Sequence, residues 1–120
     1  AATNAGRTNA FPDTSQNTTV TLPTPSAGLS FRFIYAGAAA DATDHIIKTT
    51  GNTLFFKGAL THLDTDGNTN ASVFSDGDSN SILTLATPQS YAIDIVGTSA
   101  TVYFISGFVS DVTAPAFSDA

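Results

Sequence analysis

The stretch VTLPTPSAGLSFRFIY, residues 20–35, sets what the rest of the chain must supply. Val20 and Leu22 alternate with threonines, which is typical of the end of a half-buried strand. Two prolines, at 23 and 25, fix φ and cannot donate to a ladder, so this strand must end there. A second strand follows, and one of its faces is formed by Leu29, Phe31, Phe33 and Tyr35. A face with three aromatic rings needs a hydrophobic layer opposite it.

The composition favours strands over helices. The chain has 120 residues, enough for one domain with one core. Charged residues make up only 12%, about half the usual fraction, and nineteen threonines help to replace them at the surface. Threonine is β-branched and fits the solvent face of a sheet. An all-β protein is therefore expected.

The pattern along the chain predicts about eight short strands, spaced at the intervals of about 8–12 residues that are typical of sandwiches and barrels. The expected fold is an antiparallel β-sandwich or barrel without a helix of useful length. Alternation in these strands predicts one shared core formed by Phe31, Phe33, Phe56, Ile93, Ile95 and Phe104.

Both ends of the chain differ from its middle. We expect an extended arm over residues 1–16, a β domain over 17–110 and a tail over 111–120. Phe11-Pro12 and Pro115-Ala116-Phe117 each place an aromatic ring beside a proline among small polar residues. Each end is either a solvated terminus or a segment that docks on a partner, with Phe11, Pro12, Pro115 and Phe117 as the partner-binding residues.

Charge and residue usage exclude several classes of function. The net charge is −6, with ten aspartates, no glutamate and four scattered Lys or Arg, which argues against binding nucleic-acid phosphate. The absence of cysteine excludes disulfides, thiol catalysis and thiolate metal sites. No apolar run approaches the roughly 20 residues that a membrane helix requires, and no signal segment is evident, so no membrane partner is expected.

One loop places possible calcium ligands at alternate positions. In Asp64-Thr65-Asp66-Gly67-Asn68 the glycine falls at the fourth position instead of the sixth, and Ser75 stands where a calcium loop has its bidentate glutamate. Asp-Gly pairs are also what ordinary turns require. A plain turn is the preferred interpretation, with calcium as the alternative.

No catalytic arrangement emerges from the residue pattern. His45 follows Asp44, but neighbours on a strand point to opposite faces, and no nucleophile motif surrounds the serines. His62 adjoins a predicted turn and is expected to be solvated. A glycosidase would need two facing aspartates, which nothing indicates. We expect a protein without catalytic residues, metal or cofactor, and not an enzyme.

The opening stretch resembles a segment of small structural proteins of tailed bacteriophages, especially marine ones: a strand, Leu-Pro, small residues, Gly-Leu and an aromatic strand. Similar stretches are FFKGALTHLDTDG (residues 55–67), SDGDSNSILTL (75–85) and VTAPAFSDA (112–120). This resemblance covers about three quarters of the chain. It implies a capsid decoration or cement protein on the outside of the virion, bound to the major capsid protein, often as a trimer, and assembled in the host cytoplasm.

The last long strand independently suggests association. Residues 101–109 are apolar on both faces, so one face needs cover from another subunit, and with the trimer number taken from the resemblance we expect a homotrimer. The alternative function is a fibre-tip or surface β-module that binds host glycan. Such a module would gather aromatic residues in its loops, whereas Thr61 to Ser81 contain only Phe74.

Overall fold

The computed structural model describes residues 5–37, 41–51, 53–67, 70–76 and 79–119. It confirms an all-β protein, and no helix occurs in these residues. Ten strands form two sheets. The large sheet has the order β1-β3-β8-β9-β5-β6, with bounds Thr8–Phe11, Ser30–Tyr35, Ser90–Gly97, Val102–Asp111, Phe55–Asp64 and Asn70–Phe74. The small sheet has the order β10-β7-β4-β2, with bounds Ala116–Ser118, Ile82–Leu85, His45–Lys48 and Thr18–Thr21.

The expectation of purely antiparallel strands is wrong. Three neighbouring pairs are parallel: β1 with β3, β5 with β9, and β2 with β4. Side-chain alternation is the same in both directions of pairing, so it could not reveal them. The structure has ten strands where about eight were expected. The two additional strands, β1 and β10, lie in the segments that were predicted as arm and tail.

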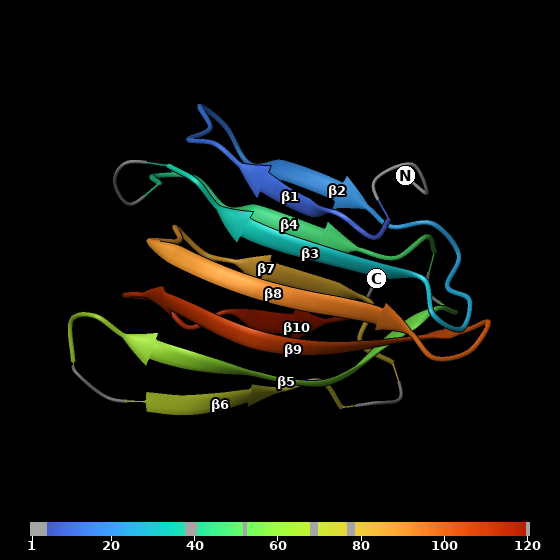
Figure 1. Ribbon diagram of the computed structural model, residues 1–120. Helices are drawn as coiled ribbons and strands as arrows, with labels where there is room; N and C mark the ends of the chain where they lie inside the picture. The colour runs from blue at the N-terminus through green and yellow to red at the C-terminus, as the bar shows by residue number, and fades with distance from the viewer. Residues whose placement is uncertain (1–4, 38–40, 52, 68–69, 77–78, 120) are drawn as a thin grey trace.

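The two sheets pack against each other, and their inward side chains form one core (Figure 1). Five residues expected in that core are buried: Phe31, Phe33, Phe56, Ile93 and Ile95. Phe104 was wrongly expected there. On β9 the inward positions are taken by Tyr103 and Ile105, which are fully buried, so Phe104 points outward and is 48% exposed.

The two sides of this arrangement differ. On one side β6 and β10 end the two sheets, and the ring of Phe117 on β10 lies 6.3 Å from that of Phe56 on β5, which closes this side. On the other side the sheets end in β1 and β2 (Figure 1). A hollow lies between these edges. The space between the sheets is therefore open along β1 and β2.

The middle of the large sheet requires a glycine. Gly107 of β9 lies opposite Ile93 of β8 with a φ of 135°, a conformation that side chains disfavour. A Cβ added at Gly107 would lie 2.1 Å from the carbonyl oxygen of Ala92. The backbones of β8 and β9 therefore approach each other too closely here for any larger residue.

Candidate interaction surface

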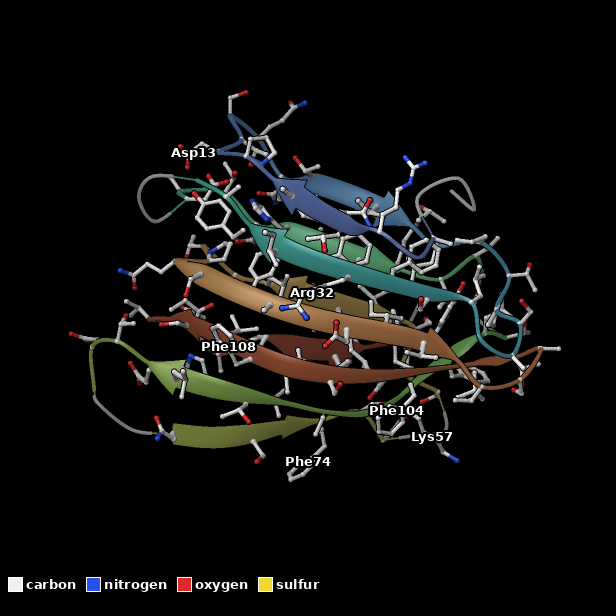
Figure 2. The ribbon with its side chains drawn as sticks, viewed as in Figure 1. Asp13, Arg32, Lys57, Phe74, Phe104 and Phe108 are labelled. Atoms are coloured by element: carbon white, nitrogen blue, oxygen red, sulfur yellow. The ribbon has the colours of Figure 1, made fainter. Side chains whose placement is uncertain are left out.

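The outward face of the large sheet carries exposed aromatic rings. Phe104 and Phe108 lie on β9 and are 48% and 38% exposed, and Phe74 on the edge strand β6 is 70% exposed. Val96 of β8, also exposed, lies directly opposite Phe104. Figure 2 shows Phe104 and Phe108 on the same side of β9 and Phe74 projecting from β6. We call Phe74, Val96, Phe104 and Phe108 the aromatic strip.

Few charges accompany the aromatic strip. Lys57 lies opposite Phe104, and Arg32 forms an exposed ion pair with Asp94 at 3.3 Å (Figure 2). Among the aspartates that the structure describes, Asp94 alone lies in the interior of a strand on this face. A face that is apolar and nearly neutral, on a chain with a net charge of −6, is suited to contact with another protein.

The two predicted docking residues of the first segment differ in exposure to solvent. Phe11 ends β1 and is buried, with its ring centroid 5.9 Å from that of Phe33 and 5.0 Å from the ring of His45. Pro12 is exposed in the following loop. While β1 stays paired with β3, the Phe11 ring is part of the chain's own core.

The predicted docking residues of the last segment lie close to the body of the protein. Pro115 is buried, and Phe117 packs against the core from β10. Asp119, just beyond β10, accepts hydrogen bonds from Ser79 Oγ and Asn80 Nδ2, both at 2.9 Å. The four predicted partner-binding residues thus form no common surface, and the aromatic strip, which sequence reasoning placed partly in the core, is the exposed apolar face.

A buried polar network lies under the loop that follows β1. Asp41 accepts hydrogen bonds from the backbone N–H and the hydroxyl of Thr14, at 3.0 and 2.9 Å, and from those of Thr43, at 3.2 and 3.0 Å. His45 Nε2 lies 2.8 Å from Asp41 Oδ2, and His45 Nδ1 lies 2.8 Å from the Tyr91 hydroxyl. The network joins the β1–β2 loop, the start of β4 and β8.

The protonation of this network follows from its geometry. Burial opposes ionisation of Asp41, but the hydrogen bonds from His45 and Thr14 outweigh it and hold the Asp41 pKa below its usual range. Burial raises the pKa of Tyr91, so the Tyr91 hydroxyl, 2.8 Å from His45 Nδ1, keeps its proton. His45 is fully buried and Tyr91 nearly so. Asp41 is buried as well, and the network connects three segments of the fold, so we assign it a structural role.

Sequence reasoning missed this network. It considered Asp44 as the partner of His45, whereas Asp44 accepts a hydrogen bond from the backbone N–H of Thr87 at 3.0 Å. The carboxylate that binds His45 is Asp41, four residues earlier and before the strand begins. The available signal was that Asp41 lies four residues before His45, a spacing that also fits an ordinary loop.

Removing this carboxylate is expected to destabilise the fold. The Asp41→Ala change leaves the partly buried N–H groups of Thr14 and Thr43 without this acceptor, and each such loss costs about 1–3 kcal/mol. We expect a decrease of about 2–3 kcal/mol in the free energy of unfolding at pH 7, measured by urea denaturation. Asp94→Ala, which removes an exposed ion pair, should cost less than about 1 kcal/mol. Equal effects of the two changes would contradict the structural role of Asp41.

The same carboxylate gives a pH test. Because the pKa of Asp41 is lower in the folded chain than in the unfolded one, its contribution is complete above the unfolded value of about 3.9 and is lost as the pH falls below it. Asp41→Asn removes this titration. Between pH 5 and pH 2 the stability of the wild type should therefore fall more steeply than that of Asp41→Asn. Parallel curves would contradict the depressed pKa.

His62 is buried rather than solvated, which corrects the sequence expectation. Its Nε2 lies 2.7 Å from Oδ1 of Asp111, at the end of β9. Burial raises the pKa of Asp111, and the hydrogen bond from His62 partly offsets this effect. Asp111 Oδ2 is the one buried side-chain oxygen or nitrogen without a hydrogen bond in the described residues. This pair ties β5 to β9 at their ends.

The possible calcium loop forms a turn in its described part. Asp64 Oδ1 accepts hydrogen bonds from the backbone N–H groups of Asp66 and Gly67, at 2.9 and 3.0 Å, and these bonds lower the pKa of Asp64. Asn68 lies outside the described residues. Within the described ranges, no group of three or more His or Asp side chains could hold a metal ion.

Comparison with known proteins identified no relative: no family model, curated protein or solved structure matches the chain. The described residues include no helix long and apolar enough to cross a membrane. The function must therefore be argued from the surface itself and from the sequence resemblance.

Proposed function

We propose that this chain is a structural protein of a bacteriophage virion, which binds the outer surface of the capsid and decorates or cements the lattice of the major capsid protein. The observation that carries the proposal is the aromatic strip, a nearly neutral apolar face on an otherwise acidic protein. Exposed apolar patches of this kind mark protein–protein contacts. The sequence resemblance described above supplies the class of partner.

The strip also supports association of the chain with itself, and we propose a homotrimer. In a two-sheet body of the β-sandwich kind, β9 is apolar on both faces, and only its inner face is covered within the chain. The molecule measures 38 × 27 × 21 Å, so one broad face is of the order of the roughly 800 Å² that a stable interface buries on each partner. A neighbouring copy covers part of the strip, the rest of the strip faces the capsid, and the trimer then binds the capsid with several contacts at once.

The aromatic strip gives the direct test. We compare the full wild-type chain with a double variant carrying Phe104→Ser and Phe108→Ser, measuring mass by light scattering and occupancy on undecorated capsids. An aromatic ring buried at an interface carries about 2 kcal/mol, or about thirtyfold in affinity. We expect the wild type to be trimeric and the variant monomeric. Loss of multivalent binding should weaken capsid occupancy by at least about thirtyfold.

The control is Val112→Ser, which changes an exposed apolar residue just outside β9. This variant should remain trimeric and decorate capsids like the wild type. A double variant that stays trimeric would show that the strip is not the subunit contact. A folded wild-type protein that leaves undecorated capsids bare at micromolar concentration would overturn the decoration function itself.

A further inference from the structure

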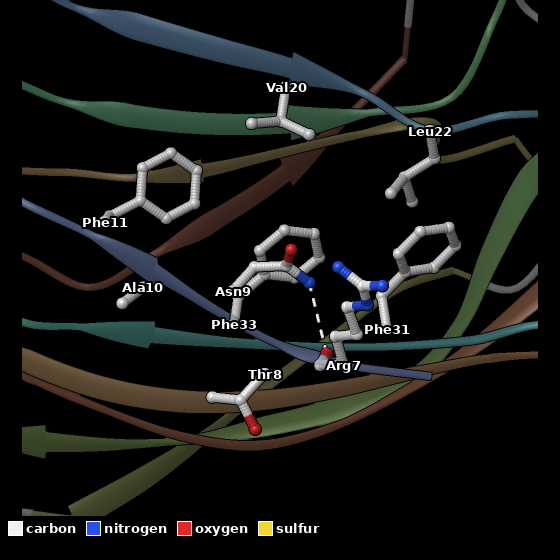
Figure 3. Close-up of a pocket in the computed structure, with 9 residues that line it drawn as sticks. All are labelled: Arg7, Thr8, Asn9, Ala10, Phe11, Val20, Leu22, Phe31 and Phe33. Carbon is white, nitrogen blue, oxygen red and sulfur yellow. Dashed lines mark hydrogen bonds between the residues drawn. The ribbon is translucent and has the colours of Figure 1, made fainter. Parts of the chain in front are cut away.

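A hollow of about 440 Å³ lies at the open side of the molecule, between the edge strands of the two sheets. Its lining combines phenylalanine rings and aliphatic side chains with polar side chains. Figure 3 shows the lining residues: Arg7, Thr8, Asn9, Ala10, Phe11, Val20, Leu22, Phe31 and Phe33. We call this hollow the edge groove. It is separate from the aromatic strip, which lies on the outward face of the large sheet.

Within the described residues, the backbone beside the edge groove is available for pairing. The carbonyl groups of Arg7 and Phe11 accept hydrogen bonds from Arg32 and Ala36, on the β3 side of β1. Alternate residues of a strand direct their N–H and C=O groups to opposite sides, so those of Thr8 and Ala10 point away from β3. β1 is the last strand of its sheet. Its outer edge can therefore accept one more strand.

Polar side chains point from β1 into the edge groove. Arg7 and Asn9 lie on the same face of the chain as the buried Phe11, because successive side chains of a strand alternate. Asn9 Nδ2 donates to the backbone oxygens of Arg7 and Arg32, at 3.2 and 3.3 Å. The Arg7 guanidinium makes no ion pair in the described part of the chain, although aspartates are the commonest charged residue.

From these features we infer that the edge groove binds an extended acidic segment of a partner protein, which adds to β1 as a further strand. Side chains on one face of such a strand would lie opposite Arg7, Asn9 and Phe11 in turn. The complementary segment has a carboxylate facing Arg7, a small polar residue facing Asn9 and an apolar residue facing Phe11, each two positions apart. None of the residues that line the groove is acidic, and Arg7 is its one charged lining residue.

The partner is a different protein rather than a second copy of this chain. One segment of this chain has the required residue types at the required spacing, Asp78-Ser79-Asn80-Ser81-Ile82, and its described part is already engaged. Ile82 lies in β7 between β4 and β10, and Asn80 Nδ2 donates a hydrogen bond to Asp119 at 2.9 Å. The inference thus adds a second interaction surface and does not depend on the proposed capsid function.

The test uses the full isotope-labelled chain and a synthetic peptide, acetyl-TLTNTDT-amide, whose Leu, Asn and Asp share one face of an extended strand. Antiparallel addition would bring its Leu to Phe11 and its Asp to Arg7. We expect NMR shift changes that saturate and centre on the amides of Thr8 and Ala10. The matched peptide TLTNTNT, which lacks the carboxylate, should bind at least about fivefold more weakly.

Two variants locate the binding. Arg7→Ala should lower the affinity for the TLTNTDT peptide to that for its uncharged analogue. Lys57→Ala removes the same charge from the aromatic face and should leave this affinity unchanged. Thr8→Pro removes an outward N–H that the β1–β3 ladder does not use, and should abolish the shifts while the protein stays folded. Arg7 could instead serve only to block the edge, as inward charges on edge strands do. If the wild type shows no shift changes at millimolar peptide, the proposal is overturned. If the peptide binds Arg7→Ala more strongly than the wild type, the proposal is overturned and Arg7 has the blocking role instead.

Discussion

The Phe33→Ala change is expected to lower the free energy of unfolding by about 3–5 kcal/mol, the usual cost of deleting a buried phenylalanine ring. Phe33 is 3% exposed, and its ring lies 5.9 Å from that of Phe11 and 6.2 Å from that of Phe31. These neighbours belong to β1 and β3, so the cavity would open between the edge strand and the core. Denaturant unfolding followed by circular dichroism measures the effect.

Phe74→Ala is the matched control, because it removes the same ring from an exposed position on β6. At a protein concentration low enough to keep the chain monomeric, this change should cost less than about 1 kcal/mol. A Phe33→Ala variant as stable as the wild type would mean that Phe33 does not belong to the core. It would also mean that the Phe33 ring does not line the edge groove as it does in this structure.

The second large effect is expected at Gly107. Gly107→Ala places a methyl group 2.1 Å from the Ala92 carbonyl oxygen and 2.9 Å from the Ile93 Cα, at a φ of 135°. Backbone strain of about 1–3 kcal/mol then adds to a similar cost of overpacking. We expect a loss of about 4 kcal/mol, measured by thermal and urea unfolding.

The control separates the clash from the backbone angle. Gly51 also has a positive φ, 71°, but a Cβ there would have no atom within 4 Å. Gly51→Ala should therefore lower the free energy of unfolding by only about 1–2 kcal/mol, the cost of a left-handed conformation. If the two changes cost the same, the close approach of β8 and β9 at Gly107 would be contradicted.

Much of the fold could be predicted because burial follows a simple period in this chain. Phe31 and Phe33 point inward as the alternation indicated, and so do Ile93 and Ile95. The same alternation showed that residues 101–109 are apolar on both faces, but it could not decide which face meets the other sheet. Phe104 was assigned to the wrong face for that reason.

The parts that could not be predicted depend on contacts between distant segments. Neighbouring residues do not reveal that β5 and β9 run parallel, or that β1 joins β3 rather than extending into solvent. Likewise, Asp111 meets His62 only because two strand ends are brought together. Phe11 is another example: its ring is isolated among small residues in the sequence, and only the pairing of β1 with β3 brings it against Phe33 in the core.

The pairing of distant strands has a consequence for how fast the chain folds. Phe55 lies opposite Val102, and Ser30 lies opposite Val96, so long loops must close before either ladder forms. The central strands β8 and β9 come late in the chain, and the large sheet cannot be assembled from its first half alone. Chains dominated by such non-local pairings fold in milliseconds to seconds rather than microseconds. The edges of β3 and β5 therefore lack their partners until β8 and β9 have been made, and the low fraction of charged residues offers these edges little protection from aggregation before then.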